Sequence, residues 1–499
     1  MKQRYLILAG LTGVWLAAAL FVSRHYLIDD ALIHLRYAAL LRRTGFFTYD
    51  GKLPSFGTSS LLWVGLLALL RGVTESPLLG KWLSVVFYLG LLGVLAAMAW
   101  RVKKEKWIVL CLLATALMPM GVRWLTDGME TSLSVLFAAL LAAMLQRRRP
   151  ETAMRAGLYA LFSAAIVLLR IEMLSLVGIA GLLLWLREND VAERSGIFVA
   201  GVRQAMPLWF GGCLAILWIR WRFGYFLPDT ALAKTSQSGL APLGGIALAL
   251  ASSFGLGLGF MVLWLASLAL VLRAVGRRES LRGGLAVWVA NLPFPLVVAL
   301  SCARGQAIQG VRYVLWPLIF STVWNAMEIN RRECRAPRWS RALAVCIFGI
   351  LVILLPLDAH YAFKSMLGRS RTFMEMRDGG LERFAGKTIV AGDVGFIGYF
   401  GHADICDMDG LVNGRGAAAM TVDARLAACA RQGIDAAFVT LDQMRAVETV
   451  EDIRSWTVCR KYDFQNVRQP DRHYLLVPEA AECGADVHPL GTASSLMSR

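Results

Sequence analysis

The chain has 499 residues, of which 57% are hydrophobic and only 17% are charged, and its formal net charge is +17. Apolar runs long enough to cross a bilayer recur from the N-terminus to about residue 357. The basic residues lie in short clusters between these runs, as they do in the cytoplasmic loops of membrane proteins. This pattern predicts a polytopic α-helical membrane protein and argues against a nucleic-acid partner.

The basic clusters also predict the topology, with about eleven spans. Lys2 and Arg4 place the N-terminus in the cytoplasm, before an uncleaved first span that leads outward. Residues 59–71 are too short to span comfortably and predict a surface or re-entrant helix. The other spans are predicted near 77–100, 107–122, 130–146, 154–169, 172–187, 203–221, 252–272, 284–302, 311–328 and 341–357. This order leaves the C-terminus outside, on the periplasmic face of a bacterial inner (plasma) membrane.

From residue 358 the hydrophobic continuity ends and short alternating runs begin. The change divides the chain into a membrane domain, 1–357, and a periplasmic soluble α/β domain, 358–499. Strands are predicted at 388–391, 436–440 and 473–477, and helices near 368–384, 420–432 and 447–455. Four cysteines fall in this domain: Cys406, Cys429, Cys459 and Cys483. In an oxidising compartment they allow two disulfides in three connectivities, and buried free thiols are the equally weighted alternative.

Two adjacent acids, Asp29 and Asp30, follow the first apolar run. Carboxylates at the mouth of a membrane span are costly to keep there, so the pair indicates a function. A helix over 29–43 would put Asp29 and Arg36 on one face, with His34 one turn beyond Asp30. Asp30 suits the N-cap of that helix, which leaves Asp29 as the favoured catalytic carboxylate.

Other predicted outer loops carry further charges at the membrane edge. Arg170 and Glu172 lie between two apolar runs and are either ligands or a self-neutralising structural pair. Lys234 is a candidate phosphate ligand, with an interfacial snorkelling lysine as the alternative interpretation. The remaining candidates in these loops are Asp127, Glu130, Asp229 and Arg312.

Short motifs in these loops together resemble one family. They are Asp-Asp-Ala-Leu-Ile-x-Leu-Arg-Tyr-Ala at 29–38, Gly-x-Ser-Ser-x-Leu-Trp at 57–63, Gly-Met-Glu-Thr at 128–131, Arg-Ile-Glu at 170–172, Leu-Pro-Asp-Thr at 227–230 and Arg-Tyr at 312–313. The chain is similar to the polyprenyl-phosphate-dependent glycosyltransferases of the GT-C superfamily. Within that superfamily it is most similar to the bacterial terminal arabinofuranosyltransferases. It departs from the family pattern at Ile171, where the family has proline, and at Asp229, where asparagine is commoner.

The resemblance implies a membrane enzyme that moves a sugar, arabinofuranose by preference, from a polyprenyl-phosphate donor. The acceptor would be a periplasmic glycan, a lipid-linked saccharide or a protein such as a pilin. Nucleotide sugars stay in the cytoplasm, so transfer outside needs a carboxylate for the acceptor proton and cations or a divalent metal ion for the phosphate. The implied site comprises catalytic Asp29 and Asp30; donor-phosphate ligands Arg36, Arg170, Lys234 and Arg312; and acceptor or sugar ligands His34, Asp127, Glu130, Glu172 and Asp229.

Two alternatives stay open. The first is a transferase that moves a hexose or an aminosugar to lipopolysaccharide or lipid A. The second is a flippase or transporter of lipid-linked sugars. A transporter should show broken helices in corresponding halves and charges near mid-span, whereas the charges here gather at the outer ends of the spans.

Overall fold

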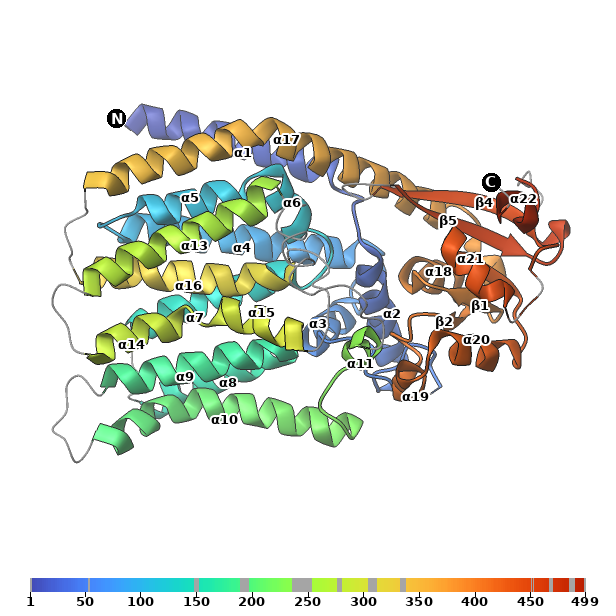
Figure 1. The fold of residues 1–499 in the computed structure, drawn as a ribbon, viewed down its shortest axis with the longest axis horizontal. Coiled ribbons are helices and arrows are strands. Elements are labelled where there is room, and N and C mark those ends of the chain that lie inside the picture. Colours follow the sequence, from blue (N-terminus) through green and yellow to red (C-terminus); the bar gives the residue numbers. More distant parts are fainter. Residues whose placement is uncertain are drawn as a thin grey trace.

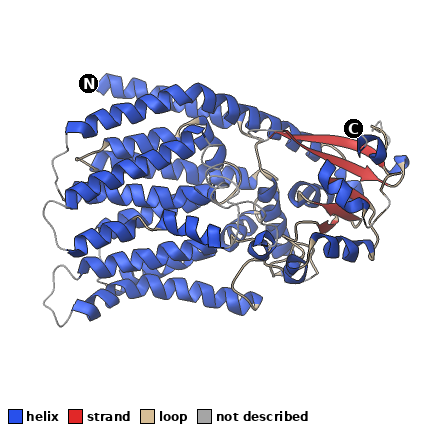
Figure 2. Cartoon of the chain, viewed as in Figure 1, coloured by secondary structure: helices blue, strands red, loops and turns tan. Residues whose placement is uncertain are grey.

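In the computed structural model, a layered bundle of long helices ends in a smaller α/β unit (Figure 1), and all the strands belong to that unit (Figure 2). The structure describes residues 2–52, 54–147, 152–188, 197–235, 254–275, 281–303, 312–332, 338–449, 451, 453–465, 470–483 and 490–497. The N-terminus lies at the end of the bundle far from the α/β unit (Figure 1). The two are therefore on opposite sides, as the predicted orientation requires, while the side that faces the cytoplasm stays a prediction.

The helices of the bundle follow the predicted apolar runs. They are α1 (Lys2–Val22), α2 (Asp29–Thr44), α3 (Leu61–Leu70), α4 (Leu79–Arg101), α5 (Trp107–Ala116), α6 (Pro119–Leu125), α7 (Thr131–Arg147), α8 (Ala153–Leu169), α9 (Leu174–Glu188), α10 (Ile197–Phe223), α11 (Asp229–Thr235), α13 (Phe254–Val275), α14 (Leu281–Ala290), α15 (Pro293–Ala303), α16 (Arg312–Arg331) and α17 (Arg338–Arg377). Two predicted spans are each broken in two, between α5 and α6 and between α14 and α15. Each second helix begins at a proline, which opens a helix readily but cannot continue one.

Within the described residues, four helices are long and apolar enough to cross a membrane, at Leu79–Arg101, Gly201–Phe223, Leu256–Ala274 and Trp339–Arg377. The pair α5 and α6, bent by 71°, makes a fifth if it counts as one span. The described residues thus contain enough apolar helices for a multi-pass membrane protein, whereas the count of about eleven spans stays a prediction. That count depends in part on basic clusters that lie outside the described residues, at 148–149, 194 and 277–278.

Helix α17 connects the bundle to the α/β unit. It runs for 40 residues without a break and crosses the predicted domain boundary after residue 357. Its C-terminal part packs on the sheet, where the Thr372 hydroxyl donates to the Asp463 carbonyl at 2.9 Å. The helix predicted over 368–384 is the end of α17 followed by the 3-10 turn η2 (Leu381–Phe384).

The α/β unit contains a five-stranded sheet in the order β2-β1-β3-β5-β4. Its strands are β1 (Thr388–Ala391), β2 (Asp404–Asp407), β3 (Ala436–Val439), β4 (Thr457–Gln465) and β5 (Pro470–Val477). Its helices are α18 (Val394–Gly401), α19 (Gly414–Ala419), α20 (Val422–Ala430), α21 (Leu441–Glu448) and α22 (Ala493–Met497). Strand β1 pairs in parallel with β2 and β3, and β5 pairs antiparallel with β3 and β4. The three predicted strands are confirmed.

The helix predicted over 447–455 is wrong. Thr440 and Gln443 form a capping box that starts α21 at Leu441, and the helix ends at Glu448. Of the two alternatives that the sequence left open for the four cysteines, the structure has the two disulfides and not the free thiols. Cys406–Cys429 joins β2 to α20, and Cys459–Cys483 joins β4 to the turn η3 (Ala480–Cys483).

The α/β unit docks on α2 through α18. Gly395 faces the backbone of Asp29, and Gly398 faces the Tyr49 hydroxyl, so closely that a Cβ at either glycine would overlap its neighbour. Any side chain at these positions would push α18 away from α2, which is why both are glycine. Tyr49 adds a hydrogen bond of 2.7 Å to the Val394 carbonyl.

Candidate active site

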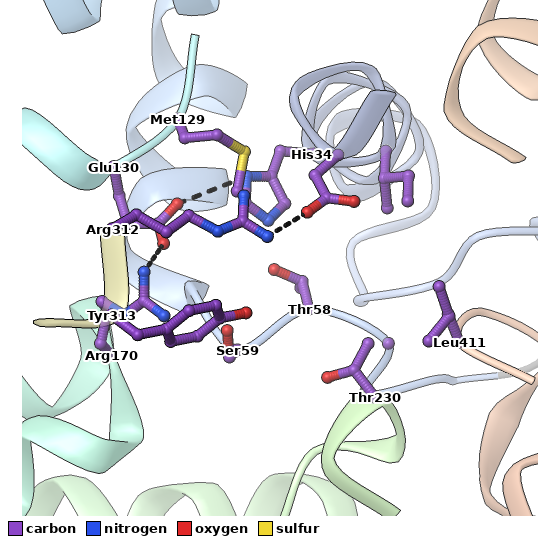
Figure 3. Close-up of a pocket in the computed structure, with 13 residues that line it drawn as sticks. His34, Thr58, Ser59, Met129, Glu130, Arg170, Thr230, Arg312, Tyr313 and Leu411 are labelled. Atoms are coloured by element: carbon purple, nitrogen blue, oxygen red, sulfur yellow. Dashed lines mark hydrogen bonds and ion pairs between the residues drawn. The ribbon is translucent and has the colours of Figure 1, made fainter. Parts of the chain in front are cut away.

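A pocket lies between α2, the loops at the end of the bundle next to the α/β unit, and that unit itself (Figure 3). It has an empty volume of about 480 Å³ and opens to solvent. It is lined by Asp30, Ile33, His34, Gly57, Thr58, Ser59, Met129, Glu130, Arg170, Thr230, Arg312, Tyr313 and Leu411. Five of the eleven predicted site residues therefore meet here, from four distant parts of the chain.

The first charged pair of the pocket joins α2 to α16. Arg312, the first residue of α16, donates from Nη2 to Oδ2 of Asp30 at 2.6 Å. The Arg312 side chain is 8% exposed, while that of Asp30 is 37% exposed. Because its side chain is partly exposed, Asp30 is the acid of this pair that an entering ligand can contact directly. It does not cap α2, because the helix begins at Asp29 with Ile28 at the N-cap.

The second charged group is a triad in which Arg170 and Glu130 are buried and Glu172 is partly exposed. Arg170 lies in extended backbone between α8 and the 3-10 turn η1 (Ile171–Met173), which directs its guanidinium inward. It contacts Glu130 at 2.8 Å and Glu172 at 2.5 Å. Burial works to raise the pKa of Glu130, but Arg170, His34 and Arg312 hold that pKa below its usual range. The self-neutralising pair considered from the sequence is present, with Glu130 as its third member.

His34 completes the pocket on the α2 side. Its Nδ1 lies 3.8 Å from Oε2 of Glu130, too far for a hydrogen bond (Figure 3). Burial lowers the pKa of His34, so the ring is neutral at neutral pH. Three buried polar atoms of the pocket have no hydrogen-bond partner among the described residues: His34 Nδ1, Glu130 Oε2 and Arg312 Nε. Buried polar atoms are nearly always paired, so this set indicates a missing polar ligand.

Asp29 and Arg36 lie outside the pocket, on the face of α2 that holds the α/β unit. The Asp29 carboxylate accepts the backbone N–H groups of Gly395 at 2.9 Å and Phe396 at 2.8 Å. The three guanidinium nitrogens of Arg36 donate to the carbonyls of Tyr49, Gly398 and Ala403. Both side chains, predicted as catalytic and phosphate-binding, are thus engaged in joining the two parts of the chain.

Four further predicted residues are also absent from the lining, one of which is Glu172, the partner of Arg170. Asp127 is fully buried behind the pocket and accepts the Met129 N–H at 3.0 Å, and burial raises its pKa to about 7. Asp229 holds the first outer loop by accepting the Phe56 N–H at 2.9 Å, which places the next residue, Thr230, in the pocket. Lys234 belongs to α11, and its side chain lies outside the described part of the structure.

The sequence did not single out four lining residues that complete the pocket, Thr58, Ser59, Tyr313 and Leu411. The first three lie within motifs that carried the resemblance, so a reading of every polar residue in those motifs would have found them. Leu411 comes from the α/β unit, where Asp407 fixes its loop by accepting the N–H groups of Asp409 and Val412. Its place against Gly57 depends on docking, which the sequence does not show.

A divalent metal ion has no ligand set in the described residues, which contain no group of three or more His, Cys, Asp or Glu side chains that could hold one. We therefore assign no step to a metal. The cations that face the pocket are the guanidinium groups of Arg170 and Arg312.

No protein-family model and no curated relative matches this chain. Among solved structures, it is similar to ArnT from Cupriavidus metallidurans in the apo state, with a TM-score of 0.55 and 14% identity over 96% of this chain and 100% of that chain. ArnT bound to undecaprenyl phosphate gives a TM-score of 0.53 and 12% identity over 96% and 99% of the two chains. At such identities the likeness shows the fold alone. The chain has the GT-C fold of ArnT, as predicted, while its likeness to the terminal arabinofuranosyltransferases stays a prediction.

Proposed function

We propose that the protein is a membrane glycosyltransferase that takes a sugar from a polyprenyl-phosphate carrier in this pocket. The observation that carries the proposal is the set of unpaired buried atoms on His34, Glu130 and Arg312, which face one pocket at the outer end of the bundle. A phosphorylated sugar offers the acceptors and hydroxyls that would pair them. The structure of ArnT bound to undecaprenyl phosphate, which shares the fold, supports a carrier of that kind.

The two guanidinium groups have different roles in this proposal. Arg170 is saturated by Glu130 and Glu172, so it orients Glu130. Arg312 has one carboxylate partner and an unpaired Nε–H, so it binds the phosphate of the donor and of the leaving polyprenyl phosphate.

Asp30 is the proposed general base. When the donor phosphate forms an ion pair with Arg312, Asp30 loses that partner. Its carboxylate then turns to the acceptor hydroxyl. The carboxylate accepts the hydroxyl proton while the acceptor oxygen bonds to the anomeric carbon and the bond from that carbon to the phosphate oxygen breaks. Hydroxyls of Thr58, Ser59 and Thr230 line the same pocket and are placed to hold the sugar.

We propose arabinofuranose as the sugar, on the strength of the loop motifs, and a periplasmic glycan, lipid-linked saccharide or protein as the acceptor. The test is transfer of radiolabel from polyprenyl-phosphoryl arabinofuranose, and in parallel from polyprenyl-phosphoryl hexose, in membranes that contain the protein. Arg312→Gln should lower transfer at least 100-fold, since the leaving phosphate loses its cation. Arg42→Gln, an exposed arginine of α2 outside the pocket, is the matched control and should retain transfer.

Wild-type transfer by Arg312→Gln at equal expression would refute the assignment of the phosphate site. Transfer from the hexose donor alone would leave the enzyme class intact and exclude the pentose. No transfer by the wild type from either donor, with envelope extract as acceptor, would refute the proposed function.

A further inference from the structure

A second hollow lies on the other side of α2, between that helix, the end of α3 and the α/β unit. It has an empty volume of about 1090 Å³, more than twice that of the active-site pocket, and shares no lining residue with it. Its walls combine two aromatic residues, Tyr399 and Phe400, with charged side chains of both signs. Nothing in the proposed transfer reaction uses these residues.

The walls of the hollow are held rigid by the contacts that dock the α/β unit. Arg36 lies in the lining and ties the Tyr49 carbonyl of the first outer loop to two carbonyls of the α/β unit. Arg71, at the end of α3, donates to the Tyr399 hydroxyl at 3.0 Å from the opposite side. A site whose walls are fixed before the ligand arrives loses less entropy on binding.

His402 carries a side chain at a backbone position that would suit glycine better. It ends α18 in the left-handed region, at a φ of 48°, where glycine would be free of strain. The chain places an exposed imidazole there instead, in the lining of the hollow. Strained positions of this kind gather at sites that bind ligands.

The charges of the hollow favour a polyhydroxylated ligand over an anion. Asp404 is already paired with Lys52 at 2.8 Å, so the remaining acids, Asp50, Glu75 and Glu382, are matched in number by Arg36, Arg43 and Arg71. The hollow therefore offers a phosphate or an acidic headgroup no excess of positive charge. Sugar hydroxyls, by contrast, both donate to carboxylates and accept from guanidinium groups, and the apolar face of a sugar ring packs on an aromatic side chain.

Four lining side chains have hydrogen-bonding groups that no described contact uses: Glu75, Glu382, Arg43 and His402. No hydrogen bond or ion pair joins the side chain of any of the four to another described residue. They come from the loop after α3, from η2, from α2 and from the end of α18, and they surround the two aromatic residues. A saccharide that enters the hollow would thus find polar partners on several sides.

We propose that this hollow is a second saccharide-binding site, which holds an outer part of a glycan-chain acceptor whose reacting end lies in the active-site pocket. The two sites lie along α2, and Asp30 of the first is about 20 Å along the helix from Arg43 of the second. A single sugar cannot contact both residues, so an acceptor that does so is a chain of several sugars. This inference rests on the proposed function in naming the ligand an acceptor, but the binding itself requires no transfer.

The experiment measures glycan binding without donor. The full-length protein in phosphatidylcholine nanodiscs is applied to an array of bacterial envelope oligosaccharides of increasing length. The double variant Glu75→Gln/Glu382→Gln should bind the captured oligosaccharides at least tenfold more weakly. The control Asp442→Asn/Glu479→Gln removes two exposed acids of the α/β unit outside the hollow and should bind as the wild type does.

The site would be supported if the wild type and the control variant capture chains of three or more sugars and Glu75→Gln/Glu382→Gln does not. Equal capture by both double variants would overturn it, as would no capture by the wild type. Capture that appears only in nanodiscs with phosphatidylglycerol and is unaffected by the hollow variant would place glycan binding outside the hollow and would also overturn the proposal. Loss of transfer in Arg312→Gln with glycan capture intact concerns only the active-site pocket, so the two proposals fail separately.

Discussion

Replacing Asp29 by asparagine should loosen the α/β unit from the bundle while sparing the chemistry. The buried carboxylate accepts two backbone N–H groups at the start of α18. Asparagine keeps the size but presents one oxygen and one NH₂ group, so one of the N–H groups would face another donor. This prediction differs from the one that the sequence suggests, in which Asp29→Asn removes a catalytic base and leaves the fold intact.

The magnitude follows from the two bonds. Loss of one charge-assisted hydrogen bond, with its N–H left buried and unpaired, costs about 3 kcal/mol. Part of this cost is offset, because the charged carboxylate is itself unfavourable at this site. Burial and the nearby Asp393 raise the pKa of Asp29. We expect a net loss of about 2 kcal/mol in docking free energy, or roughly a 30-fold shift toward the undocked state.

The assay is hydrogen–deuterium exchange of peptides that cover 392–401, with a thermal unfolding curve in the same detergent. Asp29→Asn should speed exchange in these peptides and lower the unfolding midpoint. Asp30→Asn should change neither, because Asp30 is 37% exposed and its ion pair adds little stability, but transfer should fall by about 10²- to 10⁴-fold. Wild-type exchange in Asp29→Asn together with lost transfer would refute this reasoning and return Asp29 to the catalytic role.

His34 has a pKa lowered by burial, so the unfolded chain takes up a proton near pH 6.5 that the folded chain does not, and stability should fall as pH drops from 7.5 to 5.5. His34→Gln should flatten that decline in unfolding midpoint; an identical decline in the variant would contradict the buried neutral ring. Reduction of Cys406–Cys429, which closes a loop with a sequence separation of 23, should cost about 3 kcal/mol in the α/β unit, and mass mapping should recover the cross-linked peptides before reduction but not after it. Reporter fusions should place Lys104 in the cytoplasm and Gly410 in the periplasm, and a cytoplasmic Gly410 would overturn the predicted orientation.

The sequence predicted the membrane bundle because spanning length and basic flanks are local signals. It also predicted β1, β3 and β5, which are short apolar runs between polar segments. Strands β2 and β4 were missed for opposite reasons. The four residues of β2 are too few to show a period, and β4 carries Arg460, Lys461 and Asp463, since its ladder with β5 is partly exposed. Their positions depend on pairing with distant strands.

The candidate site shows the same limit at the level of single residues. Successive residues of a helix point about 100° apart, so Asp29 and Asp30 present their carboxylates on different sides of α2. The sequence gives no local reason to choose between them. The choice is made by Gly395 and Gly398, more than 360 residues away, which let α18 settle against the Asp29 face of α2. Only the assembled structure therefore turns Asp30 to the pocket and Asp29 to the α/β unit.

That arrangement makes the α/β unit part of the proposed active site. One face of α2 bonds to α18 through Asp29 and Arg36, and the adjoining face supplies Asp30 and His34 to the pocket. The same unit contributes Leu411 to the pocket, and its backbone there lies so close to Gly57 that no side chain would fit at that glycine. If the unit undocks, the pocket loses one wall and α2 loses the contacts that fix its rotation. The bundle without its α/β unit would therefore retain Arg170 and Arg312 but would lack the geometry that brings Asp30 to them.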